Sequence, residues 1–121
     1  MFRKSRRFLI ITALVAAVAL VFAAAAYAAS ISPETQTAQG GNYVNWTGYW
    51  SGTSPFDVTF AFGDGTSAPE QNPDYSTSSG FSHPFYPCYE TTYTQKLKVI
   101  DHLGLVSTSQ SLTTVNPGNI C

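Results

Sequence analysis

The segment from residue 56 to residue 62 limits the possible folds more than any other part of the sequence. Its apolar residues Phe56, Val58, Phe60 and Phe62 occupy every second position, with polar or small residues between them. Because successive side chains of a β-strand point to opposite faces, this period of two predicts a strand with one face in a hydrophobic core. No stretch beyond residue 29 has apolar residues at helical spacing, so we expect an all-β fold.

The rest of the sequence after residue 29 indicates further short strands. Thr, Ser, Tyr, Phe and Val dominate, and turn residues recur about every ten positions, which is typical of a sandwich or a barrel. Pro84 indicates an edge strand or a bulge, because proline donates no hydrogen bond to a neighbouring strand. We predict strands at 31–37, 42–50, 56–62, 81–86, 92–100 and 105–115, with one irregular edge strand within 66–80.

Two further strands have a predictable inner face. In the strand at 42–50 the more hydrophobic set of alternate residues should face the core, and the other set should face outward. The inward set is Val44, Trp46 and Trp50, and the outward set is Tyr43, Asn45, Thr47 and Tyr49. In the strand at 92–100 we expect Tyr93, Leu97 and Val99 to point inward.

Two turns combine an aspartate with glycine. One is Gly63-Asp64-Gly65, and the other runs from Asp101 to Gly104. Glycine adopts positive φ without strain, and an aspartate carboxylate can accept hydrogen bonds from nearby backbone N–H groups. We therefore expect these residues to stabilise turns.

The N-terminus has the pattern of an export signal. Four basic residues within positions 3–7 precede an apolar run from 8 to 25, and Ala26-Tyr27-Ala28 follows as a small-x-small cleavage site. We predict a signal peptide at 1–28 and one domain at 29–121. The alternative is an uncleaved membrane anchor, because the apolar run is near the roughly 20 residues that span a bilayer. The pair Arg6-Arg7 also leaves twin-arginine export open beside the general secretory route.

The part of the chain after residue 28 is acidic. It retains two lysines, Lys96 and Lys98, against all seven acidic residues, which gives a net charge of −5. Such a domain repels a phosphate backbone, so we expect no nucleic-acid partner.

Both cysteines, Cys88 and Cys121, lie in the predicted exported domain. An even pair of cysteines in an exported protein indicates a disulfide. The first precedes the penultimate predicted strand and the second follows the last one, so an antiparallel pairing would bring both to the same end of the fold. We predict a Cys88–Cys121 bond.

Three segments resemble polycystic-kidney-disease (PKD) type domains, in the order and spacing of that family. They are Phe60-Ala61-Phe62-Gly63-Asp64-Gly65, Ser82-His83-Pro84-Phe85, and Tyr93 to Asp101 followed by Gly104. The chain departs from the family pattern where Phe60 replaces a tryptophan, Ala61 an aspartate and Gln95 an inward apolar residue. The cysteine pair is not part of that pattern.

The resemblance implies a small immunoglobulin-like antiparallel β-sandwich of about seven strands. It also implies a non-catalytic extracellular module, because PKD-type domains usually mediate adhesion, spacing or substrate contact. The function expected from it is protein–protein contact, adhesion or assembly, either in the secreted fraction or at the cell surface.

Catalytic and metal-binding chemistry has little support in the sequence. The predicted domain has two histidines, of which His83 matches a family strand position and His102 lies in a turn at the opposite end from Gly63-Asp64-Gly65. Asp64 with Glu70 or Asp74 could supply oxygen ligands, but no closely spaced acidic motif is present. We expect no enzymatic activity, no metal and no cofactor.

Exposed aromatic residues support a second function. Tyr43 and Tyr49 should lie on one outward face with Asn45 and Thr47 between them, while Tyr75, Tyr86 and Tyr89 fall in or near loops. Sugar-binding proteins stack such rings on pyranose units, although aromatic residues on a sheet can also simply pack against each other. The alternative function is therefore a small carbohydrate-binding protein that recognises an extracellular polysaccharide.

Overall fold

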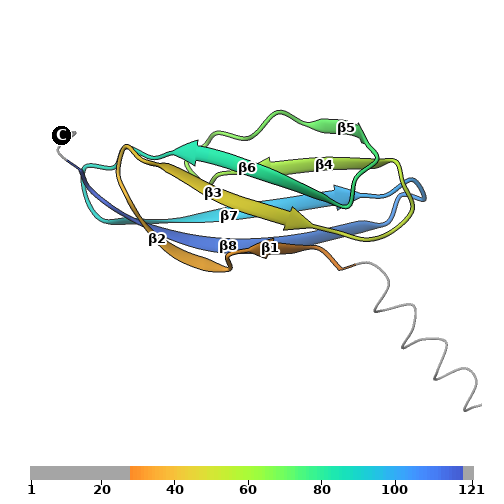
Figure 1. The fold of residues 1–121 in the computed structure, drawn as a ribbon, viewed down its shortest axis with the longest axis horizontal. Helices are drawn as coiled ribbons and strands as arrows, with labels where there is room; N and C mark the ends of the chain where they lie inside the picture. Colours follow the sequence, from red (N-terminus) through yellow and green to blue (C-terminus); the bar gives the residue numbers. More distant parts are fainter. Residues whose placement is uncertain (1–27, 119–121) are drawn as a thin grey trace, which may run out of the picture.

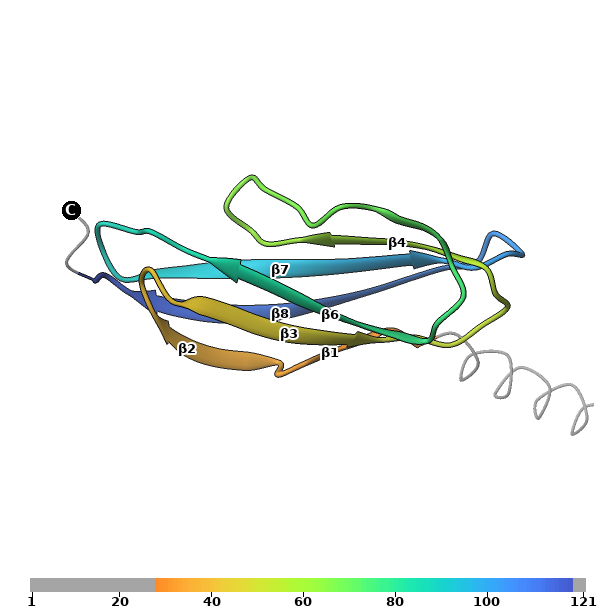
Figure 2. The ribbon, with the colours of Figure 1, turned by 45° about the horizontal axis from the view of Figure 1, so that its top comes forward.

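A computed structural model of the chain describes residues 28–118, which form eight strands in two sheets (Figure 1). The strands are β1 (Ser30–Ser32), β2 (Thr35–Gln39), β3 (Tyr43–Tyr49), β4 (Phe56–Ala61), β5 (Gln71–Asp74), β6 (Ser78–Pro84), β7 (Thr91–Ile100) and β8 (Val106–Asn116). Sheet A has the strand order β1-β3-β6, and sheet B has the order β2-β8-β7-β4-β5. In both views β3 and β6 lie across β7 and β8, as in a sandwich of two layers (Figure 2).

The prediction of a single first strand at 31–37 is wrong. That segment divides at Pro33 into β1, which pairs antiparallel with β3, and β2, which pairs parallel with β8. Proline has no N–H group for a strand ladder, so the chain leaves sheet A here and enters sheet B after Glu34. The parallel β2–β8 pair is also an exception to the antiparallel arrangement that we predicted.

The other predicted strands are present with shifted ends. Strand β6 begins three residues before the predicted segment at 81–86 and ends at Pro84, and it is an edge strand of sheet A as predicted. Strand β5 is the short edge strand expected within 66–80, and its pairing with β4 shifts register between Phe56 and Val58.

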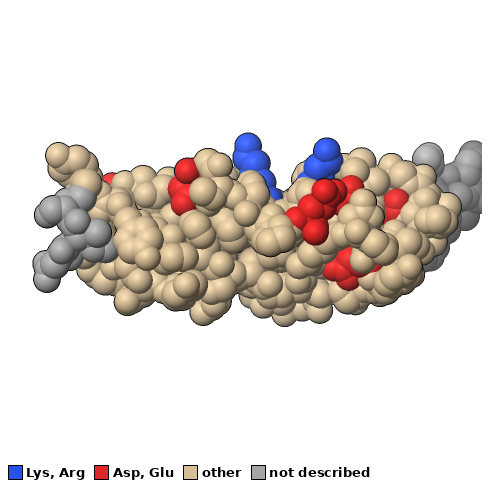
Figure 3. Space-filling model, turned by 90° about the horizontal axis from the view of Figure 1, so that it is seen from above, with Lys and Arg blue, Asp and Glu red and all other residues tan. Residues whose placement is uncertain are grey.

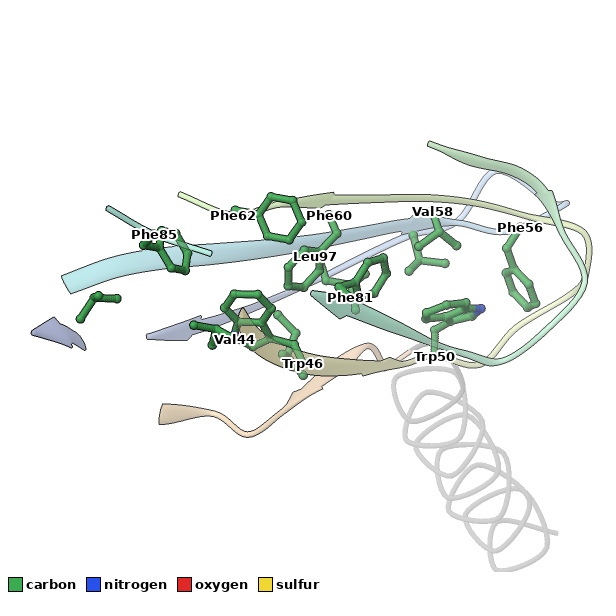
Figure 4. Close-up of a cluster of buried hydrophobic side chains, with 13 residues drawn as sticks. Val44, Trp46, Trp50, Phe56, Val58, Phe60, Phe62, Phe81, Phe85 and Leu97 are labelled. Atoms are coloured by element: carbon green, nitrogen blue, oxygen red, sulfur yellow. The ribbon is translucent and has the colours of Figure 1, made fainter. Parts of the chain in front are cut away.

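Aromatic side chains fill the space between the two sheets (Figure 4). The inward residues predicted for the segments 42–50 and 56–62 are buried. Trp46 lies within the cluster, with its ring centroid 5.7 Å from those of Phe60 and Phe62. Phe60 in turn stacks on Phe81 of the other sheet at 4.2 Å and 6°. Contacts of this kind between rings add to the free energy gained by removing their apolar area from water.

One inward position of β7 is polar. Gln95 is fully buried between Tyr93 and Leu97, at the position where the family resemblance led us to note a missing apolar residue. Its amide nitrogen donates to the carbonyl oxygens of Phe62 (2.9 Å) and Tyr93 (3.2 Å). Its amide oxygen accepts from the hydroxyl groups of Ser111 and Thr113, each at 2.9 Å. The hydrogen-bonding capacity of the side chain is thus satisfied inside the core.

The predicted signal peptide lies outside the described residues, apart from Ala28. The cleavage site and the domain boundary at 28/29 therefore remain predictions. Within residues 28–118, no helix is long and apolar enough to cross a membrane.

Cys121 also lies outside the described residues, so the predicted disulfide is retained as a proposal. Cys88 lies in the connection between β6 and β7. This connection is at the end of the sandwich where β8 finishes (Figure 1). At this end a Cβ atom on Gly40 would lie 3.0 Å from the nitrogen of Gly118 and 3.6 Å from the Cδ atom of Pro87. The chain next to Cys88 and the chain leading to Cys121 therefore meet at Gly40, which supports the pairing. Intact-mass measurement with and without reductant should show a difference of two hydrogen atoms.

Candidate functional site

The outer face of sheet A carries the two tyrosines that we predicted to point outward. Strand β3 is the central strand of this sheet, so its outward side chains lie in the middle of the face. Tyr43 is 72% exposed and Tyr49 is 48% exposed. They are six positions apart along the strand, which places their Cα atoms about 20 Å apart.

Short, uncharged residues surround the two tyrosines. The register puts Tyr49 between Ser30 and Ser78, and Thr47 between Ser32 and Gly80. On β6, Ser82 lies beside Asn45 and Pro84 beside Tyr43. The face therefore consists of a low strip of hydroxyl and amide groups with an aromatic ring at each end. We call this surface, formed by residues 30, 32, 43, 45, 47, 49, 78, 80, 82 and 84, the tyrosine face.

The other exposed tyrosines are in connecting segments, as predicted. Tyr75 lies between β5 and β6, and Tyr86 and Tyr89 lie between β6 and β7. They do not belong to the outward rows of sheet A, so they offer internal controls for the tyrosine face.

The Gly63-Asp64-Gly65 turn has the structure that its residues predict. Both glycines have positive φ, 97° and 89°, and the Asp64 carboxylate accepts from the backbone N–H of Thr66 at 3.0 Å. A side chain on Gly63 would lie 2.4 Å from the carbonyl oxygen of Thr94, so the close approach to β7 also requires glycine.

His83 joins this turn to strand β6, a contact that the sequence motifs did not reveal. Its Nε2 atom lies 2.7 Å from Oδ2 of Asp64, and its ring stacks on Phe62 at 4.2 Å and 8°. Burial raises the pKa of Asp64, but hydrogen bonds from Thr66 and His83 outweigh this effect and hold the pKa below its ordinary value. His83 thus ties the turn to sheet A, at the strand position where it matches the family pattern.

The same cluster lacks the geometry of a nucleophile relay. The hydroxyl oxygen of Thr66 is 3.3 Å from Nε2 of His83, the same nitrogen that contacts Asp64. A hydroxyl nucleophile is activated when the carboxylate and the hydroxyl bind opposite ring nitrogens. His102 is at the other end of sheet B, in the turn between β7 and β8, and its backbone N–H donates to Thr53.

The acidic residues that could have held a cation bind different partners. Asp64 binds Thr66 and His83, whereas Asp74 accepts from the backbone N–H of Ser76 at 2.8 Å. A side-chain hydrogen bond with Asp57 and the negative charge of the Asp57 carboxylate raise the pKa of Glu70. Within residues 28–118, no three His, Cys, Asp or Glu side chains gather as a metal site would require.

Asp101 stabilises the turn between β7 and β8, as predicted. Its Oδ1 atom accepts from the backbone N–H groups of Leu103 (3.0 Å) and Leu105 (2.9 Å), and its Oδ2 atom accepts from that of Thr53 (3.2 Å). Desolvation raises its pKa, but these hydrogen bonds outweigh desolvation and hold the pKa below its ordinary value.

This lowered pKa predicts a loss of stability in acid. A carboxyl group with a lower pKa in the folded state stabilises the fold above its unfolded pKa, near pH 4, and loses that contribution as the pH falls through the folded value. The free energy of unfolding should therefore decrease below about pH 4, and the decrease should be smaller in Asp101→Asn. Urea denaturation at a series of pH values measures both slopes, and equal slopes would contradict the assignment.

The arrangement of the strands matches solved immunoglobulin domains. A structure of the N-terminal four Ig domains of Dscam1 isoform 1.9 aligns with TM-score 0.54 and 16% identity over 74% of this chain and 21% of that chain. The corresponding Dscam1 isoform 4.44 structure aligns with TM-score 0.54 and 17% identity over 76% of this chain and 21% of that chain. The fold is immunoglobulin-like.

This likeness establishes the fold alone, because the identity is low. The chain spans about a fifth of the length of the Dscam1 chains that it matches. No protein-family model and no curated protein matches the sequence. The closer resemblance to PKD-type domains therefore remains a proposal.

Proposed function

We propose that this chain is a secreted or cell-surface, non-catalytic module of the PKD type that binds an extracellular protein through the tyrosine face. The export signal that we predict at 1–28 supports this location. Retention of the apolar segment at 8–25 as an anchor would leave the same domain outside the membrane.

The composition of the tyrosine face carries the proposal. Its ten positions hold two tyrosines, one proline and seven small or amide residues, with no acidic or basic side chain. All seven acidic residues of the chain lie elsewhere, although the domain is acidic as a whole. Tyrosine offers a large, rigid contact area at little cost in side-chain entropy, and Ser, Gly and Asn offer adaptable hydrogen bonds, so this composition is typical of recognition surfaces.

A linear, uncharged polysaccharide is the second candidate partner. The strip between the two tyrosines contains the side chains of Asn45 and Thr47 and is bordered by serines of β1 and β6. Sugar hydroxyl groups could bind these polar groups while a tyrosine ring stacks on a pyranose unit at each end of the strip.

The absence of catalysis is part of the proposal and has two supports. An immunoglobulin-like fold is a frequent scaffold for binding, although a fold alone does not decide function. In addition, the carboxylate of Asp64 and the hydroxyl group of Thr66 both contact the same ring nitrogen of His83. This arrangement suits a structural contact between the turn and β6.

Alanine at Tyr43 and Tyr49 tests the proposed face. In binding assays with cell-envelope material from the cells that export the protein, we expect each substitution to weaken binding by about tenfold or more, as at a hot-spot tyrosine. Tyr75→Ala and Tyr89→Ala are the matched controls and should bind like the wild type. Digesting the protein or the polysaccharide in the envelope material identifies the class of partner. Binding that depends on Tyr75 or Tyr89 instead would refute the proposal.

A further inference from the structure

The outer face of sheet B has a hollow of about 350 Å³ that is separate from the tyrosine face. It lies around Lys96 and Lys98, and its other lining residues with polar side chains are Thr59, Ser67, Thr108, Ser109 and Gln110. Figure 3 shows the two lysine side chains, in blue, on either side of a notch in the surface.

The strand register explains why the surface is hollow here. Lys96 pairs with Ala61 on one side and with Gln110 on the other, and Lys98 pairs with Thr59 and Thr108. Most of these neighbours are short, so the long lysine side chains have open space around them. The segment after β4 turns back to form a bridge between Ala61 and Ser67, which closes one side of the hollow.

The charge of the hollow is opposite to that of the domain. Lys96 and Lys98 are the only basic Lys or Arg residues within residues 28–118, and both point to the same face of β7, with Cα atoms about 7 Å apart. Within residues 28–118, His83 and Asp64 form the only ion pair. Neither lysine ammonium group therefore lies within 4.0 Å of a carboxylate of these residues. Both ammonium groups are therefore available to attract an anion to this face of an otherwise acidic domain.

The two lysines are not equivalent. Lys98 also lines a second hollow together with Asp57 and Glu70, and these acids partly offset its charge. Lys96 is away from that acidic pair, so it should contribute more to the attraction of an anion.

We propose that this hollow binds a sugar acid, whose carboxylate lies between Lys96 and Lys98. Its hydroxyl groups would bind the side chains of Thr59, Thr108 and Gln110, which line the same hollow. A volume at the lower end of the range for small-ligand sites suits a single ring. The net charge of −5 of the domain disfavours a long polyanion and favours a ligand with one charge.

Sodium glucuronate is the probe, and NMR chemical-shift titration of the exported protein at low ionic strength is the measurement. We expect shifts on β4, β7 and β8 with a dissociation constant of about 1 mM, as for a shallow site with charge-assisted hydrogen bonds. Glucose lacks the charge and acetate lacks the ring, so both should bind at least about tenfold more weakly.

Substitutions assign the effect to the lysines. Lys96→Gln keeps most of the side-chain length and removes the charge, and it should weaken glucuronate binding by about tenfold. Lys98→Gln should weaken it less, and Tyr89→Ala, at a residue that lines neither the hollow nor the tyrosine face, should not change it. Absence of shifts, equal binding of glucose, equal binding of acetate, or full binding by Lys96→Gln would each overturn the proposal, independently of the function of the tyrosine face.

Discussion

Trp46→Ala is expected to lower the free energy of unfolding by about 3–5 kcal/mol, the usual cost of removing a large buried aromatic side chain. Trp46 is 2% exposed and contacts Phe60, Phe62 and Phe85, so its removal leaves a cavity between the two sheets. Urea denaturation under non-reducing conditions measures the change.

Two control variants test whether the loss comes from core packing. One is at another position of β3, and the other is at Trp46 itself. Tyr49→Ala also truncates an aromatic residue of β3, but on the outer face, and should cost less than about 0.5 kcal/mol. Trp46→Phe should cost less than Trp46→Ala, because it keeps an aromatic ring and removes the buried indole N–H, which has no hydrogen-bond partner among residues 28–118. Similar losses for Trp46→Ala and Tyr49→Ala would contradict the assignment of inner and outer faces.

Gln95→Leu is expected to cost about 2–4 kcal/mol, although leucine is apolar and the site is fully buried. The substitution leaves the carbonyl of Phe62 and the hydroxyl groups of Ser111 and Thr113 without their partner. Each buried polar group that loses its hydrogen bond costs about 1–3 kcal/mol.

Combining Gln95→Leu with Ser111→Ala and Thr113→Val tests this explanation. Replacing the polar partners together can be nearly neutral, since no hydroxyl group is then left without a partner. We therefore expect the triple variant to recover most of the stability lost in Gln95→Leu. Additive losses across the three substitutions would show that the hydrogen bonds of Gln95 are not the cause.

The sequence predicts the aromatic strands of the core better than the first strand and the pairing of β2. Strands β3 and β4 combine alternating polarity with large aromatic residues, so both their existence and their inner faces follow from the period of two. The two aspartate turns are predictable for a similar reason, because the bonds that define them are local.

Features that depend on distant contacts were not predictable in the same way. Strand β8 turns Ser111 and Thr113 inward and leaves Leu112 exposed, so hydrophobicity alone would choose the wrong face. The inward orientation is satisfied by Gln95, a residue on another strand. Likewise, the division of the first strand at Pro33 and the parallel pairing of β2 depend on which sheet each half can join.

The candidate sites differ in how far the sequence indicates them. Tyr43 and Tyr49 follow from the alternation within one strand, so the outward placement that we predicted is confirmed. The strip between them and the hollow around Lys96 depend on the register of three or more strands, which a single sequence does not reveal.

Tyrosine nitration in the presence of envelope material tests the central claim that recognition occurs on the tyrosine face. Five tyrosines, at 43, 49, 75, 86 and 89, are exposed in the free domain and should react with the reagent. If the tyrosine face binds the partner, Tyr43 and Tyr49 will be protected while Tyr75, Tyr86 and Tyr89 continue to react. Protection of the three loop tyrosines with Tyr43 and Tyr49 still reactive would contradict the claim.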